Sequence, residues 1–376
     1  MEGGGDIGWG QRDRPTPYQI WQKEEGLPIN KGAFVQSLHK LDVADWPRMG
    51  QKGAFVNLAG QEHDDGYVLE IAPGGQTEVQ HHLFEATVCV ISGRGATTLW
   101  HPGATEKQTI EWQRGTVFAP PLNCYYQHFN LDGQRPARLW AMTNAPMVIN
   151  LFRSPDLVFN CPYEPRDRYN MEEDYFTARG EKIARSQWRT NYIADVRTFE
   201  LDHSPTRGAN SYLTSFVMSN NSMAVHIAEW SSGTYLKAHR HNVGAHLLHL
   251  EGKGYSLLWY EGQEKDLVKV DWEEGTVFSP REMEFHQHFN TGPGISRHIA
   301  FRLGDLDIRV EKLGFGYDFW QELQGIPYEC EDPSIYETYE AECKKNGAVP
   351  TLPRPDYTTC SEEKFLRMRA PAGARG

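Results

Sequence analysis

Short runs of apolar residues, broken by Gly, Pro, Asn and Asp, dominate the chain from about residue 34 to residue 309. Residues 86–91 (ATVCVI) are typical of these runs, which are rich in Val, Ile, Leu, Tyr and Thr. Turn residues recurring about every 8–12 positions are typical of antiparallel strands that close into a sandwich or barrel. The pattern therefore predicts an all-β fold.

The same region contains an internal repeat. Residues 115–120 (GTVFAP) recur as residues 275–280 (GTVFSP), and residues 127–130 (QHFN) recur as residues 287–290 (QHFN). Both matches have the same offset of 160 residues. Two matched blocks at one offset predict two copies of one domain, which we call copy one and copy two.

The repeat and the composition divide the chain into five parts. We predict an N-terminal arm (residues 1–33), copy one (34–152), a linker (153–191), copy two (192–309) and a C-terminal arm with a tail (310–376). A short helix is predicted within the linker at residues 171–176.

The two arms share a sequence pattern. Residues 18–28 (YQIWQKEEGLP) are similar to residues 317–327 (YDFWQELQGIP). Each segment predicts a short amphipathic helix that ends at Gly and is followed by Pro.

Copy two contains histidines at spacings that suit a metal site. His239 and His241 are two residues apart, so they share one face of a strand, and we expect His246 and His286 to reach the same point from neighbouring strands. Imidazole is a ligand for Fe, Cu, Ni and Zn. His246 could instead pack beside a site of three histidines. His249 is opposite in phase to His246 and is expected to be a core or surface residue.

Five further residues flank these histidines: Gly233, Gly252, Gly275, Pro280 and Asn290. The arrangement resembles the two motifs of the cupin superfamily, of the form G-x5-H-x-H-x3/4-E-x6-G and G-x5-P-x-G-x2-H-x3-N. It departs from them because His246 stands at the acidic position and one extra residue precedes His286.

The duplication makes the chain resemble a bicupin, such as the gentisate dioxygenase-like and oxalate decarboxylase-like members. The resemblance implies two tandem double-stranded β-helix, or jelly-roll, domains with short helical arms. It also implies a divalent transition metal in copy two, with Fe(II) expected first and Mn, Ni, Cu or Zn as alternatives.

Further polar residues are expected near this metal. His288 shares the face of His286, and His298 and Arg302 share a face on the next strand. His288, His298 and Tyr255 are candidate general acids or bases, and Arg302 is a candidate ligand for a substrate carboxylate. As alternatives, His288 could bond the barrel wall, Arg302 could form a structural ion pair and Tyr255 could be a core residue.

Copy one lacks most of the ligand set. Alignment through Gly74 places Gln80, His82, Thr87 and Tyr126 where copy two has His239, His241, His246 and His286. Copy one is therefore predicted to be a structural or dimerising half. The alternative is a shifted site built from His81 or His82 with Glu85 and His128.

Composition narrows the choice of partners. The 376 residues include 50 acidic and 38 basic side chains, for a net charge of −12, which argues against nucleic acid and anionic membranes as partners. The longest apolar runs fall far short of the roughly 20 residues that a bilayer requires.

Six scattered cysteines without a CxxC pair suggest reduced thiols, and we expect a cytoplasmic protein. Cupin barrels usually pair through edge strands, so the resemblance implies that exposed edges are covered by the other copy or by another subunit, and we expect a homo-oligomer.

Three classes of function fit these observations. The first is a non-haem iron dioxygenase acting on a small anionic aromatic or dicarbonyl substrate. The second is a metal-dependent lyase, decarboxylase or isomerase acting on a small carboxylate or enolate. The third is a non-catalytic module that binds a small ligand.

Overall fold

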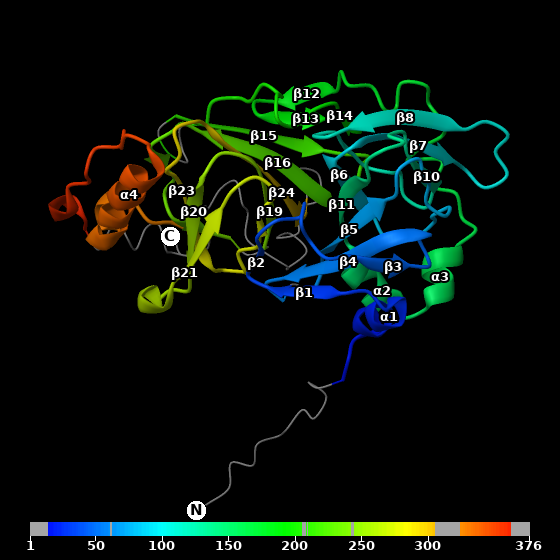
Figure 1. Ribbon diagram of the computed structural model, residues 1–376, viewed down its shortest axis with the longest axis horizontal. Helices are drawn as coiled ribbons and strands as arrows, with labels where there is room; N and C mark the ends of the chain where they lie inside the picture. The colour runs from blue at the N-terminus through cyan, green and yellow to red at the C-terminus, as the bar shows by residue number, and fades with distance from the viewer. Residues whose placement is uncertain are drawn as a thin grey trace, which may run out of the picture.

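Two β-barrels of the same design follow one another along the chain in the computed structural model (Figure 1). The structure describes residues 14–60, 62–204, 208, 210–241, 244–304 and 324–361. Each barrel consists of a large sheet and a small sheet, with apolar side chains between them. The predicted all-β fold of two tandem jelly-roll domains is thus confirmed.

Copy one forms the first barrel. Its large sheet contains β1 (Ile29–Gly32), β3 (Ala44–Trp46), β4 (Gln51–Leu58), β5 (Asp65–Ile71), β6 (Ala86–Ser92), β9 (Val117–Phe118), β11 (Ala137–Thr143) and β14 (Tyr192–Ile193). Its small sheet contains β7 (Arg94–Trp100), β8 (Gln108–Gln113) and β10 (Tyr125–Asn130).

Copy two forms the second barrel. Its large sheet contains β2 (Phe34–Val35), β12 (Glu181–Ala184), β13 (Gln187–Arg189), β15 (Ser211–Val217), β16 (Met223–Trp230), β19 (His246–Glu251), β22 (Val277–Phe278) and β24 (Ser296–Leu303). Its small sheet contains β17 (Thr234–Tyr235), β18 (His239–Arg240), β20 (Gly254–Trp259), β21 (Val268–Trp272), β23 (Phe285–Asn290) and β25 (Gln324–Gly325).

The strand orders reproduce the repeat seen in the sequence. The order β4-β5-β11-β6-β9 in copy one matches β15-β16-β24-β19-β22 in copy two, and β10-β7-β8 matches β23-β20-β21. Equivalent residues therefore occupy equivalent places in the two barrels, and their chemistry can be compared position by position.

The two barrels exchange short strands, which corrects the predicted boundaries. β2 lies at the predicted start of copy one but pairs with β22 of copy two. β14 lies at the predicted start of copy two but pairs with β9 of copy one. The segment before each barrel therefore adds a strand to the large sheet of the opposite barrel, which a linear division of the sequence does not reveal. The predicted linker likewise supplies β12 and β13 to the large sheet of copy two.

The large sheets pack against each other and form a core shared by both copies. Trp140 of β11 and Phe301 of β24 meet edge to face across this interface, with ring centroids 5.1 Å apart. Both side chains are fully buried. Each large sheet thus has one face toward its own barrel interior and one face toward the other copy.

The helices lie outside the sheets of the two barrels (Figure 1). The predicted N-terminal helix is present as α1 (Pro17–Glu25), begins at a Thr16 capping box and ends at Gly26, whose φ is 72°. α2 (Ala145–Phe152) and α3 (Pro155–Asn160) follow copy one and were not predicted. Residues 171–176 form turns instead of the predicted helix.

The C-terminal region described here begins at residue 324, so most of the predicted arm helix at residues 317–327 lies outside the described residues. It contains η3 (Tyr328–Cys330), α4 (Pro333–Asn346) and η4 (Tyr357–Thr359), and a further turn of helix, η1 (Glu264–Asp266), lies in copy two. α4 packs Tyr336, Tyr339 and Cys343 on the outer face of the small sheet of copy two.

Cys330 and Cys360 form a disulfide, which corrects the expectation that every cysteine is a free thiol. The free cysteines include Cys89 and Cys124, and burial raises the pKa of each thiol to about 12. Within the described part of the chain, no helix combines the length and the apolar character needed to cross a membrane.

Candidate metal centre

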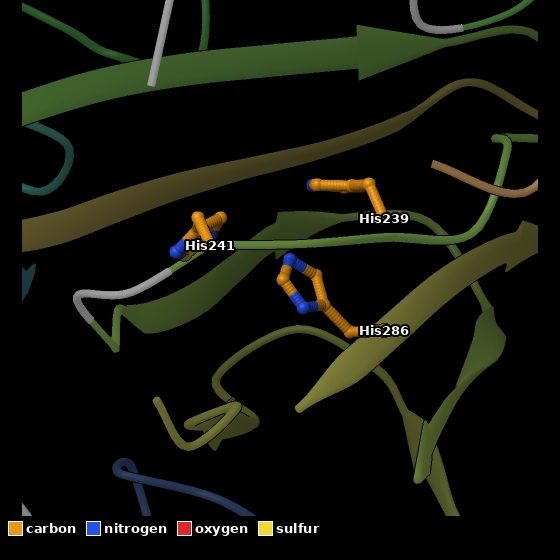
Figure 2. Close-up of side chains that lie close together, drawn as sticks. All are labelled: His239, His241 and His286. Carbon is orange, nitrogen blue, oxygen red and sulfur yellow. The ribbon is translucent and has the colours of Figure 1, made fainter. Parts of the chain in front are cut away.

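β18 and β23 bring three of the four predicted ligands together. His239 lies opposite His286 in the strand register, and His241 follows His239 on the same side of the chain. One ligand nitrogen from each of the three rings lies within 4.8 Å of the other two. Figure 2 shows the three rings close together, with His286 on one strand and His239 and His241 on the neighbouring segment. The geometry suits a metal ion held by three imidazoles.

Backbone carbonyls set the tautomers of two of these rings. Nδ1 of His239 lies 3.3 Å from the carbonyl oxygen of Lys237, and Nδ1 of His286 lies 3.0 Å from that of Glu284. Because a carbonyl can only accept, each Nδ1 carries a proton, and in the neutral ring each Nε2 keeps its lone pair. Such bonds orient histidine ligands toward a metal. The residues present therefore fit a divalent transition metal.

His246 lies outside this group. It pairs with Phe301, whose side chain belongs to the core between the two barrels, so His246 faces copy one. Its Nε2 lies 3.7 Å from Oδ1 of Asp64, a buried residue of copy one. The neighbouring residue Ala245 packs in the interior of copy two instead. The structure thus favours a site of three histidines over the expected four.

His249 shows that the predicted phase of β19 was reversed. It lies opposite His298 and stacks on Trp272 inside copy two, with ring centroids 3.9 Å apart. Burial lowers the pKa of His249 well below its usual value, so the ring is neutral. Alternation assigned His246 and His249 to opposite faces correctly, but it did not tell which face was inside.

His288 lies inside copy two behind the cluster. Its ring centroid is 5.5 Å from that of His286, and its Nδ1 lies 2.8 Å from Oγ of Ser256. The same hydroxyl oxygen accepts a hydrogen bond from Nε1 of Trp272 at 3.0 Å. These bonds tie three strands of the small sheet together.

Copy one contains the same three-residue arrangement. Nδ1 of His128 lies 2.7 Å from Oγ1 of Thr97, which accepts a hydrogen bond from Nε1 of Trp112 at 2.9 Å. Because this arrangement recurs in the copy that lacks the ligand set, it supports the barrel wall rather than catalysis. The alternative interpretation of His288 as a wall residue is therefore favoured.

His298 belongs to a polar patch found only in copy two. It is buried, with ring centroids 5.3 Å from Trp230 and 6.0 Å from His226. The equivalent positions of His298 and His226 in copy one are Leu139 and Tyr67, which pack in an apolar interior. His298 and His226 thus add two imidazoles to the copy that contains the ligand cluster, and His298 remains a candidate general acid or base.

Tyr255 does not face the cluster, which corrects its prediction as a catalytic residue. In β20, Ser256 pairs with His288, so Ser256 faces inward and the adjacent Tyr255 faces outward. Tyr255 stacks on Phe289 with ring centroids 4.4 Å apart, within the outer core that α4 covers.

Arg302 is half-buried near the end of β24. It is four residues from His298 and therefore shares the inward face of that strand. Its contact with a substrate stays a prediction.

Copy one confirms the alignment and explains the loss of its site. Gln80 pairs with Tyr126, just as His239 pairs with His286. Both nitrogens of His82 are engaged, since Nδ1 lies 2.7 Å from the carbonyl of Phe84 and Nε2 lies 2.8 Å from the hydroxyl of Tyr126. Burial lowers the pKa of His82 to about 3.

The alternative site in copy one is not assembled. Glu85 instead forms an ion pair with Arg168 at 3.1 Å and accepts hydrogen bonds from Asn144 and Ser222. Among the residues that the structure describes, no three potential ligands of copy one lie within 4.8 Å of one another. Glu85 holds the two copies together, because Ser222 belongs to copy two.

Comparisons with known proteins give a likeness in fold. No family model and no curated protein matches the chain. Oxalate decarboxylase from Bacillus subtilis is similar with a TM-score of 0.48 and 13% identity, covering 73% of this chain and 76% of that one. A formate complex of oxalate decarboxylase from Lactobacillus farciminis has a TM-score of 0.49 and 11% identity, covering 72% and 86%. Vicilin from Corylus avellana (hazelnut) has a TM-score of 0.49 and 9% identity, covering 90% and 97%.

The sheets of this structure show two barrels of the same design directly. Since the similar structures share so little sequence with this chain, we base its function on the site itself.

Proposed function

We propose that copy two binds a divalent transition metal through His239, His241 and His286 and is an enzyme acting on a small anionic substrate. The observation that carries this proposal is the convergence of three imidazole nitrogens within 4.8 Å inside one barrel. Two of the rings have tautomers that present Nε2 as the ligand atom. In copy one, Gln80 and Tyr126 replace His239 and His286, so the cluster is not a requirement of the fold.

The charge of the site supports an anionic substrate. Three neutral imidazoles leave the charge of a divalent ion uncompensated by its ligands. A bound ion of this kind supplies Lewis-acid polarisation of a carboxylate or enolate oxygen. Arg302, on the same face of β24 as His298, would pair with a second carboxylate oxygen through its guanidinium group.

The polar patch around His298 favours proton transfer. A buried imidazole near the ligand cluster can hold or move a proton without a change in metal oxidation state. His298 and His226 are found in copy two and replaced in copy one. We therefore propose a metal-dependent lyase, decarboxylase or isomerase that acts on a small carboxylate or enolate.

An iron dioxygenase is the second candidate. Three protein ligands leave several positions of a six-coordinate ion available for other molecules, which suits a substrate and O₂ bound side by side. The ligand cluster therefore also supports oxidation of an anionic aromatic or dicarbonyl substrate.

Anaerobic turnover separates the two candidates. The protein, loaded with Mn(II) or Fe(II), is assayed under argon and in air against oxalate, 2-oxo acids, 1,3-dicarbonyls and gentisate. Mn(II) belongs in the panel because it occupies centres in the Bacillus subtilis oxalate decarboxylase. We expect turnover under argon, reduced about 100-fold in His298→Asn. Turnover that requires O₂ would establish the dioxygenase instead.

A homo-oligomer and a cytoplasmic location are also proposed. Light scattering after size-exclusion chromatography measures the oligomeric state. Cell fractionation measures the location. The disulfide between Cys330 and Cys360 makes an oxidising compartment the alternative to the cytoplasm.

A further inference from the structure

The strand that carries His239 is short and depends on the C-terminal region. β18 contains only His239 and Arg240, and its contact with β23 is the single pair of His239 and His286. On its other side β18 pairs with β25, with His239 opposite Gly325. The amide of Ile326 also donates to the carbonyl of Ala238 at 2.8 Å. Residues 324–326 therefore cover what would otherwise be the free edge of the ligand strand.

A buried carboxylate then anchors the chain beyond β25. Glu331 is 6% exposed, and its two oxygens accept hydrogen bonds from the hydroxyl of Tyr235 and, at 3.0 Å, from Nε2 of Gln287. Tyr235 belongs to β17, and Gln287 stands between His286 and His288 in β23. Glu331 thus links β17, which precedes β18 in the chain, to β23, which pairs with β18.

The disulfide closes this region into a loop. Cys330 precedes Glu331 and is bonded to Cys360, so the disulfide ties η3 to η4 across the intervening helix α4. Tyr339 of α4 packs against Tyr235 with ring centroids 4.8 Å apart. We call residues 324–361 the C-terminal clasp.

We infer that the C-terminal clasp holds the ligand strand in place. Glu331 is its positioning residue, and the disulfide between Cys330 and Cys360 is the crosslink that stabilises it. The inference rests on the proposed metal site and explains how that site is kept in shape. Outer partners that orient ligands commonly change metal affinity about 10- to 100-fold when removed. A dithiol reductant would break this crosslink by giving two electrons and two protons to the disulfide, which leaves two thiols and an oxidised reductant.

Glu331→Gln is the conservative variant. Its carbonyl oxygen can still accept from Tyr235, and its amide can donate to Oε1 of Gln287, which has no partner in the described structure. Glu331→Ala removes both bonds. Glu337→Gln is the matched control, because Glu337 lies on α4 in an exposed ion pair with Arg354.

The test combines two measurements on the full chain. Hydrogen exchange of the amides of residues 238–241 is measured on metal-free protein, and the Kd for Mn(II) is measured by competition with a chelator. We expect faster exchange and a Kd about 10-fold weaker in Glu331→Ala and in the double variant Cys330→Ser, Cys360→Ser. Glu331→Gln and Glu337→Gln should stay close to wild type.

The outcomes distinguish this inference from the proposed function. Unchanged exchange and unchanged Kd in a folded Glu331→Ala protein overturn the clasp. Faster exchange with an unchanged Kd overturns its link to the metal. If the wild-type protein binds no Mn(II), Fe(II) or Zn(II), the proposed metal site fails, while the exchange data still decide whether the clasp holds β18.

Discussion

His239 and His286 face each other across two neighbouring strands, with ring centroids 4.1 Å apart. Their direct pairing means that one strand register fixes the distance between two of the three ligands. The third, His241, follows from the two-residue period of the chain that carries His239. The site is therefore built from a single strand pairing and one alternation of side chains.

Loss of either paired ligand should empty the site. We expect His239→Ala and His286→Ala to retain less than about a tenth of the wild-type metal, measured by elemental analysis after purification without chelators. His246→Gln should keep its metal, because His246 faces Asp64 of copy one. Metal loss in a folded His246→Gln protein would return His246 to the ligand set.

Copy one should gain a site when its ligands are restored. The double variant Gln80→His, Tyr126→His places two imidazoles at the positions of His239 and His286 and frees Nε2 of His82 from Tyr126. We expect the metal content to rise from about one to about two ions per chain. An unchanged content, with a folded protein, would mean that the surrounding apolar interior prevents binding.

Glu331 should make the protein less stable as pH rises. Burial raises the pKa of Glu331 to about 7, against the opposing effect of the hydrogen bonds from Tyr235 and Gln287. A raised pKa in the folded state favours folding at low pH, and this contribution is lost between about pH 4.5 and about pH 7. The loss is of the order of 3 kcal/mol, at 1.36 kcal/mol per pKa unit.

Chemical denaturation at several pH values measures this effect. The free energy of unfolding of the wild type should fall across this window relative to that of Glu331→Gln, which cannot ionise. Parallel pH profiles for the two proteins would contradict a raised pKa of Glu331.

Removal of the Tyr255 hydroxyl should be tolerated. Among the residues that the structure describes, this buried oxygen has no hydrogen-bond partner, and burial raises the pKa of Tyr255 above the usual value. A buried unsatisfied hydroxyl costs about 1–3 kcal/mol, so Tyr255→Phe should be as stable as the wild type or more stable. Thermal unfolding and metal analysis measure this, and a loss of turnover in a stable Tyr255→Phe protein would restore Tyr255 as a catalytic candidate.

Much of the architecture was predictable from the sequence because strands and repeats leave local signals. The turn spacing predicted the all-β class, and the blocks at residues 115–120 and 275–280 predicted two equivalent copies. The same repeat correctly matched Gln80 with His239 and Tyr126 with His286, which the strand pairing confirms. The His-x-His spacing likewise placed His239 and His241 on one side of the chain.

The tertiary structure decided what these local signals leave open. Alternation fixes which residues of a strand share a face, but not which face is inside, because each connection between strands resets the phase. His246 was therefore expected inside and lies against Asp64. His249 was expected to be a core or surface residue and lies inside the barrel that holds the site. The exchange of β2 and β14, the disulfide and the C-terminal clasp depend on contacts between distant segments, which no local pattern encodes.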